Sequence, residues 1–460
     1  MGTGEIRVND VERSIFKTCD ILGLYGTDLD EGTAYLLGRA VGSRAQGRRV
    51  VVGADVRPSS PILARSLVNG LLRSGADVID LGQAPTPALH YARAQREAYG
   101  TVVVTGSHHP AAYNGFRITL GDLPMTPEEL AALRLSMESG VFAENLGHYE
   151  RGEVLDDYRR SLEEAFAGSL RTERHVVVDA GSGALSDLAP SVLEALGQRV
   201  ERLCCDPDGT FPHRDPNPAL PSSLQALRER VLATGAELGL AYDGDGDRLI
   251  LVDGRGRVQP ADRTQVLLIR HLLPEAPGAK VIYDLKSSSI VPEEIVAAGG
   301  APLLERPGQA FMVRRFLTEG ALLAGSLSGH YALRACGRDD ALYATLALLR
   351  ALDAQGATYT EAIDSVPAYP NTPDLRVPCT TPRARRIVEE LREAFADRPM
   401  HTVDGVRIEF PDGWALARPA TAEPLLTLRY EAHTREALEE IQERVHAASP
   451  TLQDVLAYGR

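Results

Sequence analysis

Long apolar runs and an excess of basic charge are both absent from this sequence. No apolar stretch among its 460 residues approaches the roughly 20 residues that a membrane-spanning helix needs. Residues 1–10 are polar and acidic, unlike a secretory signal peptide. The formal net charge is -14, whereas nucleic-acid backbones bind to basic stripes. We therefore expect no membrane and no nucleic-acid partner, and a small molecule as the ligand.

Cysteine and lysine are also scarce. The five cysteines are an odd number and lack the spacing of a metal site, so we expect free thiols in a cytoplasmic protein. Only three of the 49 basic residues are lysines, namely Lys17, Lys280 and Lys286. Lys286 directly follows an apolar stretch, where a compact ammonium group can serve a ligand in a way that arginine cannot. An ordinary exposed lysine is the alternative.

One polar segment, residues 105–110 with the sequence TGSHHP, follows an apolar stretch that predicts a buried strand. Open α/β sheets bind ligands at the carboxyl ends of their strands, so the Ser107 hydroxyl is a candidate functional group. The nucleophile elbow of serine hydrolases needs glycines where Thr105 and His109 stand, which excludes that class. A polar loop with a capping serine explains this segment equally well when it is taken alone.

A second polar segment lies between two apolar stretches and carries carboxylates on alternate residues, with glycines between them: Asp243, Asp245 and Asp247. Glycine lets the backbone curl tightly, so these carboxylates can surround one hard cation. An EF-hand calcium loop would need a glycine at Arg248, a glutamate at Gly254 and flanking helices. The segment therefore favours a magnesium site with open positions for a phosphoryl oxygen.

The length of the chain excludes a single core and indicates several domains. Strand and helix patterns alternate until a proline-rich stretch, after which a helix, several strands and a helix predict an α+β domain. We predict four domains, with limits at residues 1–152, 153–255, 256–367 and 368–460. Each of the first three presents one polar loop at the end of a strand, which is consistent with a structural repeat.

Four segments resemble, in order, the motifs of the α-D-phosphohexomutase family, which includes phosphoglucomutases and phosphomannomutases. Residues 105–110 resemble its phosphoserine loop, and residues 243–248 resemble its metal-binding loop. Residues 325–330 (GSLSGH) resemble its sugar-binding loop, and residues 418–424 (RPATAEP) its phosphate-binding loop. The resemblance extends over essentially the whole chain. It implies three related α/β domains with mixed sheets and a smaller C-terminal α+β domain around a central cleft.

The resemblance also implies Mg²⁺-dependent transfer of a phosphoryl group between the 1- and 6-positions of a hexose phosphate, with a sugar bisphosphate as activator or intermediate. Ser107 would carry the phosphoryl group, and Mg²⁺ would bind a phosphoserine oxygen together with Asp243, Asp245 and Asp247. The remaining implied catalytic residues are His108, Arg248, Lys286 and His330. The implied substrate-binding residues are Arg57, Arg117, Ser326, Ser328, Arg418 and Thr421. A purely structural role is equally consistent with His108 and His330, and a surface position with Arg57.

Several positions depart from the family pattern. A glutamate usually stands at Ser326 and a histidine at Gln309, an arginine usually stands at Leu22, and hydroxyl side chains usually stand at Ala420 and Ala422. These changes concern recognition of the sugar and of the distal phosphate, whereas the phosphoryl-transfer residues are retained. We expect the chemistry to be kept on glucose or mannose phosphates or on a modified analogue, such as an amino, deoxy or carbocyclic sugar phosphate.

Two other functions are consistent with the same motifs. A catalytically weak paralogue would bind a phosphosugar as a sensor or scaffold, although such a protein has no need of an acidic metal triad. A phosphatase would use Ser107 and the same metal, with water reaching the phosphoserine. The sequence leaves open whether the protein is a monomer or a homodimer.

Overall fold

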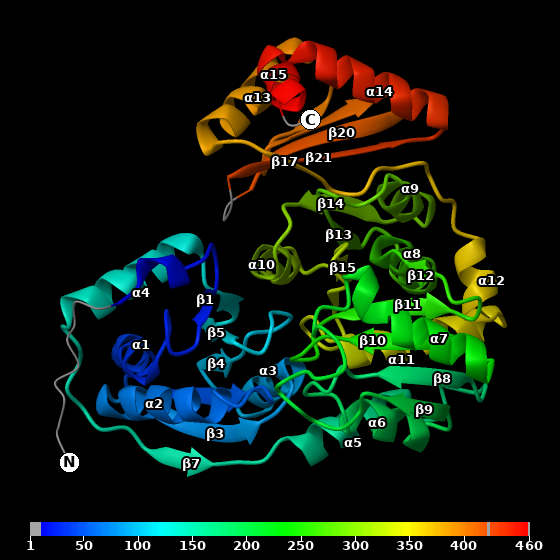
Figure 1. The fold of residues 1–460 in the computed structure, drawn as a ribbon. Helices are drawn as coiled ribbons and strands as arrows, with labels where there is room; N and C mark the ends of the chain where they lie inside the picture. Colours follow the sequence, from blue (N-terminus) through cyan, green and yellow to red (C-terminus); the bar gives the residue numbers. More distant parts are fainter. Residues whose placement is uncertain (1–10, 421–423, 459–460) are drawn as a thin grey trace.

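The computed structural model describes residues 11–420 and 424–458, and its strands form four sheets that follow one another along the chain. Figure 1 shows the four corresponding parts, coloured from blue to red, around the centre of the molecule. We call them segments I to IV. Segments I to III are α/β units with mixed sheets, and segment IV is an α+β unit, which confirms the predicted fold class. Among the described residues, no helix combines the length and apolarity needed to cross a bilayer.

Segment I has a seven-stranded sheet in the order β1-β5-β4-β2-β3-β7, with β6 paired to β5. Its strands are β1 (Ile21–Leu24), β2 (Arg49–Ala54), β3 (Asp77–Gln83), β4 (Gly100–Val104), β5 (Tyr113–Leu120), β6 (Leu123–Pro124) and β7 (Tyr149–Arg151). Its helices are η2 (Arg13–Ile15), α1 (Glu31–Arg44), α2 (Ser60–Arg73), α3 (Thr86–Gln95) and α4 (Pro127–Ser139). The valines of β2 and β4 are almost fully buried, as expected for parallel strands covered by helices on both faces.

Segment II has the strand order β12-β11-β10-β8-β9. Its strands are β8 (His175–Asp179), β9 (Arg199–Leu203), β10 (Leu238–Tyr242), β11 (Leu249–Asp253) and β12 (Val258–Gln259). Its helices are α5 (Leu155–Phe166), α6 (Leu188–Ala195), η3 (Pro221–Leu224) and α7 (Gln225–Thr234). Strand β12 still pairs with β11, so this sheet extends slightly past residue 255, where we placed a domain limit. The other limits stay predictions.

Segment III has the strand order β14-β13-β15-β16. Its strands are β13 (Lys280–Asp284), β14 (Ala301–Glu305), β15 (Leu323–Gly325) and β16 (Tyr331–Leu333). Its helices are α8 (Ala261–Leu272), η4 (Leu273–Glu275), α9 (Ile290–Ala297), α10 (Gln309–Glu319), α11 (Ala341–Gln355) and α12 (Tyr359–Asp364).

The three α/β segments share one core topology. In each, a first strand pairs in parallel with a second and a third strand, and the third pairs antiparallel with a fourth. These cores are β5-β4-β2-β3, β11-β10-β8-β9 and β16-β15-β13-β14. The connection from the third to the fourth strand holds residues 105–110 in segment I, 243–248 in segment II and 326–330 in segment III. The repeat expected from the sequence is therefore present as topology, and it presents its three polar loops from equivalent places.

Segment IV is an antiparallel sheet in the order β17-β21-β20-β19-β18 with helices packed on it. Its elements are β17 (Leu375–Pro378), α13 (Thr381–Ala394), β18 (Met400–His401), β19 (Val406–Phe410), β20 (Gly413–Pro419), β21 (Leu425–Ala432), α14 (Arg435–Ala448) and α15 (Pro450–Tyr458). One apolar cluster contains residues of segments I, II and III, beside a separate cluster within segment I, whereas most of the apolar core of segment IV is its own. Segment IV is therefore the part least tied to the others by apolar packing.

The five cysteines are free, and each is half-buried rather than fully buried. The expectation of free thiols is confirmed. Burial raises the pKa of the Cys19 thiol to about 12, so this group is a poor nucleophile at neutral pH.

Candidate active site

The segment I loop holds Ser107 in an unusual backbone conformation. Its φ angle is 47°, a left-handed value that is uncommon for a residue other than glycine and that persists only where the surroundings impose it. The Ser107 amide donates to the Thr105 hydroxyl at 2.7 Å, and that hydroxyl donates to buried Asp55 at 2.8 Å. The Gly106 amide also donates to Asp55, at 3.2 Å. The serine is thus aimed by a network anchored on the residue that follows β2.

Arg57 is also part of this network, and its side chain is entirely buried. Its Nε donates to Asp55 at 2.9 Å, and its two Nη groups donate to the carbonyl oxygens of Ser107, His109 and Pro110 at 2.6–2.8 Å. We had predicted that Arg57 binds the substrate. In the structure its guanidinium group is bonded to the loop carbonyls and is not exposed, an arrangement that favours positioning of the loop that carries Ser107.

The three aspartates of the segment II loop converge. One carboxylate oxygen from each of Asp243, Asp245 and Asp247 lies within 4.8 Å of the others, and all three residues are buried. Asp243 Oδ1 accepts from the amides of residues 246–248 at 3.0–3.2 Å, so the loop curls around this carboxylate. Strands β10 and β11 flank the loop, which confirms that the helix-flanked EF-hand is excluded.

These residues fit a hard divalent cation. Asp245 Oδ1 and Asp247 Oδ1 are buried and accept no hydrogen bond from any described residue, and such orphaned oxygens are costly unless a cation uses them. Burial, together with the charges of Asp247 and Asp245, raises the pKa of Asp243 well above its usual value. A divalent cation would relieve that repulsion, because hard cations take oxygen ligands.

Two side chains outside the loop also hold the aspartates. Arg117 on β5 pairs with Asp245 at 3.0 Å and with Asp247. Burial acts to raise the pKa of Asp247, but the charges of Arg117 and His330 outweigh burial and hold it well below its usual value. Thr86, the first residue of α3, donates its hydroxyl to Asp245 Oδ2 at 2.7 Å. Sequence reasoning missed this contact between Thr86 and the triad.

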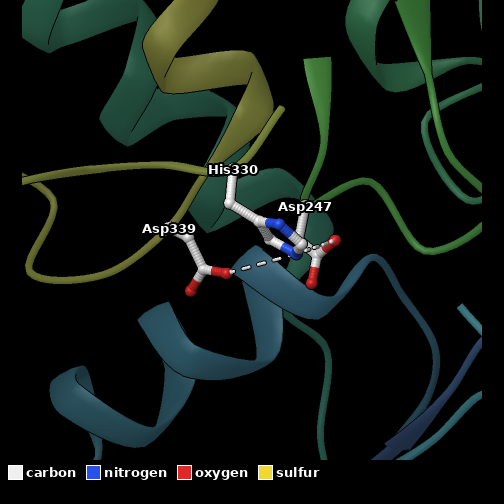
Figure 2. A group of neighbouring side chains, drawn as sticks. All are labelled: Asp247, His330 and Asp339. Atoms are coloured by element: carbon white, nitrogen blue, oxygen red, sulfur yellow. Dashed lines mark ion pairs between the residues drawn. The ribbon is translucent and has the colours of Figure 1, made fainter. Parts of the chain in front are cut away.

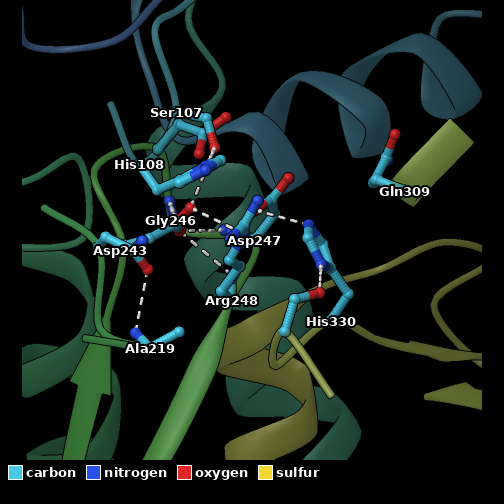
Figure 3. Close-up of polar contacts among 12 residues, drawn as sticks. Ser107, His108, Ala219, Asp243, Gly246, Asp247, Arg248, Gln309 and His330 are labelled. Atoms are coloured by element: carbon cyan, nitrogen blue, oxygen red, sulfur yellow. Dashed lines mark hydrogen bonds and ion pairs between the residues drawn. The ribbon is translucent and has the colours of Figure 1, made fainter. Parts of the chain in front are cut away.

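The serine loop and the aspartate loop meet directly. Ser107 Oγ lies 3.2 Å from Asp243 Oδ2 and 3.2 Å from His108 Nδ1, and the Arg248 guanidinium lies 3.7 Å from Asp243. Figure 3 shows these side chains gathered between the two loops. Burial and the charge of Arg248 lower the pKa of His108 well below its usual value. His108 is therefore neutral near pH 7 and can accept a hydrogen bond from the serine hydroxyl.

The segment III loop approaches the aspartates through His330. The Ser326 hydroxyl lies 2.8 Å from the Ser328 hydroxyl, which lies 3.0 Å from His330 Nδ1. His330 Nε2 faces Asp247 at 3.3 Å and Asp339 at 4.0 Å, and Figure 2 shows the ring between the two carboxylates. Nδ1 is within hydrogen-bond distance of Ser328, whereas Nε2 is buried and has no hydrogen-bond partner among the described residues. The two serines thus orient His330.

Lys286 does not reach this group of side chains. Its ammonium pairs with Asp374 in the connection that leads to segment IV, and Asp374 also accepts from Arg429 at 3.4 Å. We had predicted a catalytic lysine. In this structure the side chain ties segment III to the connection before β17, and Lys286 is not among the residues that line the central cleft.

Segment IV contributes Arg418, at the end of β20. Its Nε donates to Asp404, and both residues line the cleft described below. Thr421 and Ala422, which follow it in the predicted phosphate-binding loop, lie outside the described residues.

One cleft of about 840 Å³ joins these elements. Of the predicted site residues, Ser107, His108, Arg117, Arg248 and Arg418 line it. Ser326 and His330 line a small adjoining pocket that shares Gln309 with the cleft. The other described site residues that we predicted do not line the cleft, namely Arg57, Asp243, Asp245, Asp247, Lys286 and Ser328. The space is large enough for a sugar phosphate.

Two basic residues that sequence reasoning missed also line the cleft, namely Lys17 and Arg306. They stand near Leu22, where the family usually has an arginine, and the Arg306 guanidinium stacks 3.7 Å from the centre of the Phe311 ring. Their only sequence signal was basic charge next to a predicted strand or loop. With the three arginines already placed, the cleft has five basic side chains against the carboxylates of Asp20 and Asp404, a positive balance that suits an anionic ligand.

A repeated aspartate is a further feature that we missed. Asp55, Asp179 and Asp284 stand at or directly after the end of the first strand in each repeat, and each accepts from the backbone amide two residues later at 2.7–3.0 Å. Asp284 also accepts from the Leu327 amide of the segment III loop at 2.8 Å. The signal in the sequence is an aspartate that closes an apolar strand in all three segments. A buried carboxylate therefore supports each polar loop, either by direct hydrogen bonds or through an arginine that the carboxylate binds.

Comparison with family models assigns the chain four consecutive matches. The models described as phosphoglucomutase/phosphomannomutase alpha/beta/alpha domains I, II and III match residues 13–144, 156–256 and 260–369. The model of the C-terminal domain of the same proteins matches residues 375–448.

Individual proteins match over nearly their whole lengths. A phosphomannomutase/phosphoglucomutase of Pseudomonas aeruginosa is 37% identical over 436 residues, covering 93% of this chain and 94% of that protein. A phosphoglucomutase of Neisseria meningitidis is 35% identical over 451 residues, covering 95% and 97%. A crystal structure of a phosphoglucomutase/phosphomannomutase family protein from Burkholderia thailandensis has a TM-score of 0.89 and 35% identity, covering 96% of this chain and 98% of that one.

Proposed function

The chain belongs to the phosphoglucomutase/phosphomannomutase family and is a phosphohexomutase; from this premise we propose that it moves the phosphoryl group of a hexose phosphate between the 1- and 6-positions by way of Ser107. The observation that carries the proposal is the approach of Ser107 Oγ to within 3.2 Å of the aspartate triad. A serine that carries a phosphoryl group needs cationic charge at that point.

The residues around Ser107 have separate tasks in this proposal. Neutral His108 accepts the hydroxyl proton at Nδ1 when the serine attacks a phosphoryl group. Arg248, beside Asp243, is placed to pair with an oxygen of the transferring group. Arg117 holds two of the aspartates while lining the cleft. His330, oriented by Ser328, offers a ring nitrogen on the segment III side for proton transfer to or from a sugar hydroxyl.

Asp243, Asp245 and Asp247 would hold Mg²⁺, which when bound neutralises charge on the transferring phosphoryl group. The orphaned oxygens of Asp245 and Asp247 support this assignment.

Arg418 is our proposed clamp for the phosphate that is not being transferred. It lines the cleft from segment IV, far along the chain from the serine loop, and its pairing with Asp404 holds the guanidinium group in place. A mutase must bind its sugar in two orientations, and a sugar bisphosphate as intermediate or activator presents a phosphate at each end. Lys17 and Arg306 add cations for the same purpose, because Leu22 offers none.

The substrate that we propose is a hexose phosphate with altered ring hydroxyls, or a cyclitol phosphate. Ser326 is neutral, buried and bonded to Ser328, so it does not present the carboxylate that the family uses for ring hydroxyls. A pocket without that buried acceptor penalises a missing or modified hydroxyl less strongly.

The test replaces Ser107 by alanine. A lost hydrogen bond costs about 1 kcal/mol, which accounts for less than a tenfold change in rate. We expect kcat to fall far more than tenfold, and a phosphorylated species in intact-protein mass spectrometry to disappear. Ser182→Ala is the matched control, because Ser182 is also buried and has a φ angle of 57° but lies outside the cleft.

The outcomes separate the alternatives. If Ser107→Ala keeps more than a tenth of the wild-type kcat, the carrier role is wrong. Absence of any phosphorylated wild-type chain after incubation with a hexose bisphosphate would favour a phosphosugar-binding protein. Steady release of inorganic phosphate, without isomerised sugar phosphate, would favour a phosphatase.

A further inference from the structure

A second cavity, of about 520 Å³, lies on the other side of the loop that follows β16. Its walls come from three segments: α3 of segment I, α5 of segment II, and residues 334–340 with the start of α11 in segment III. Asp339 also lines the small pocket beside His330, so it forms part of the partition between this cavity and the active site. Apart from Asp339, the residues proposed above for phosphoryl transfer take no part in its walls.

Three arginines line this cavity, and no carboxylate balances two of them. Arg338 is only 8% exposed, and its single hydrogen bond is to the carbonyl oxygen of Asp122 at 2.9 Å. Arg334 donates to the carbonyl oxygens of Gly320 and Ala321. Among the described residues, both arginines have backbone carbonyls as hydrogen-bond partners, and neither forms an ion pair with a carboxylate. Buried charges are normally paired, so the buried Arg338 guanidinium is the group that most needs an anion, whereas Arg334 is exposed.

The third arginine is paired only at its exposed end, and the buried acids of this cavity take their hydrogen bonds from neutral donors rather than from the arginines. Arg93 pairs with Asp122 at 2.6 Å, but Asp122 is 91% exposed, and Arg93 Nε is buried without a hydrogen-bond partner. Asp340 is bonded to the Tyr158 hydroxyl at 2.7 Å and to the Tyr343 amide at 2.9 Å.

Asp339 is likewise engaged, since its two oxygens accept from Gln309 at 3.0 and 3.1 Å. Burial lowers the pKa of Arg338 to about 10; the charge of Asp339 opposes this effect, and the charge of Arg93 adds to it. A bound anion would relieve both effects.

We propose that this cavity is a second binding site, distinct from the catalytic cleft, for the phosphate group of a small phosphorylated metabolite. Guanidinium groups match phosphate oxygens in geometry and charge, and a cluster of three suits a dianion. Tyr91, Tyr158 and Tyr343 line the same space and offer ring surface to the organic part of a ligand.

The position of the site makes it regulatory. Helix α3, which carries Arg93, begins at Thr86, and the Thr86 hydroxyl holds Asp245 of the metal triad. Arg338 immediately precedes Asp339, which holds Gln309 and faces His330. An anion bound by Arg93 and Arg338 would join segments I and III at a point one residue from the His330 partner. Occupancy therefore biases the arrangement of two active-site walls.

The test is calorimetric titration of the full-length chain with inorganic phosphate and, in a second arm, with glucose 6-phosphate. We expect two classes of site for the sugar phosphate. Arg334→Gln and Arg338→Gln should each weaken binding at the second cavity about tenfold or more. Arg418→Gln should weaken binding at the catalytic cleft instead. Arg96→Gln is the matched control, because Arg96 follows α3 but lines a different cavity, and it should leave both classes unchanged.

Arg334 is exposed and bonded only to carbonyls, so its variant keeps the test valid if Arg338→Gln fails to fold. The arm with the tighter binding at the Arg334-dependent site identifies the source of the phosphate. Crystals soaked in tungstate, a tetrahedral phosphate mimic, should show an ion in this cavity, within reach of Arg93, Arg334 and Arg338. A single class of site that Arg418→Gln removes, with Arg334→Gln and Arg338→Gln binding as the wild type does, would overturn the proposal.

Discussion

Replacing Arg57 by methionine separates a residue that positions the serine loop from one that binds the substrate. In the structure the guanidinium pairs with buried Asp55 and donates to three carbonyl oxygens of the loop, and it stacks 4.8 Å from the Phe211 ring centre. Breaking a buried ion pair costs about 3–5 kcal/mol, because the remaining charge is left without its partner.

At this site we expect the cost of breaking the ion pair to lie at the lower end of that range. Asp55 keeps hydrogen bonds from the Thr105 hydroxyl and the Gly106 amide, so its charge is not left bare. A loss of about 3 kcal/mol in a domain of this size lowers the midpoint of thermal unfolding by roughly 6–12 °C. We expect that shift for Arg57→Met, with faster hydrogen exchange in residues 105–110, since the loop amides lose their anchor.

Kinetics supply the second readout. A misplaced Ser107 lowers kcat, while KM for the sugar phosphate stays within about twofold, because Arg57 does not line the cleft. Arg418→Met is the matched control from inside the cleft, where we expect a raised KM and an unchanged unfolding midpoint. If Arg57→Met unfolds as the wild type does and mainly raises KM, then Arg57 binds substrate directly and our assignment is refuted.

Two further predictions concern the metal triad and the altered sugar loop. Asp245→Asn removes one hard carboxylate ligand, so activity and its dependence on Mg²⁺ should fall together; a wild-type rate that survives EDTA would contradict the metal assignment. Ser326→Glu restores the carboxylate usual in the family, and we expect it to raise kcat/KM on glucose 1-phosphate or mannose 1-phosphate, on which the wild type should be weak. Family-typical wild-type activity on both sugars, unimproved by the substitution, would show that Ser326 is neutral.

The local pattern of apolar and polar residues was sufficient to predict the secondary-structure elements and the polar loops between them. Apolar stretches bounded by polar turns predicted β4, β10 and β11, because a buried strand needs only a short run of β-branched or aliphatic residues. The helix flanks required for an EF-hand were correctly excluded on the same grounds. The spacing of Asp243, Asp245 and Asp247 predicted their convergence, since ligands on alternate residues of one tight loop are close in space whatever surrounds them.

The partners of side chains that contact residues remote in sequence could not be predicted in this way. Arg57 was expected to bind the substrate or to lie at the surface, and only the packed structure shows that the loop from residue 107 to 110 covers it. Lys286 was likewise expected near the sugar, yet Asp374, far along the chain, engages its ammonium. In both cases a long flexible side chain has several partners within reach, and the choice depends on groups that are remote in sequence.

The sequence by itself determined the fold class, the family and the identity of the two loops that meet at Ser107 and the aspartate triad. Those features depend on short-range composition and on residues a few positions apart. Only the tertiary structure decided that Thr86 holds Asp245, that Asp339 holds Gln309 behind His330, and that unpaired arginines face a second cavity. These contacts join residues that are up to 159 positions apart in the chain. Their energies depend on burial, which the local sequence pattern does not reveal.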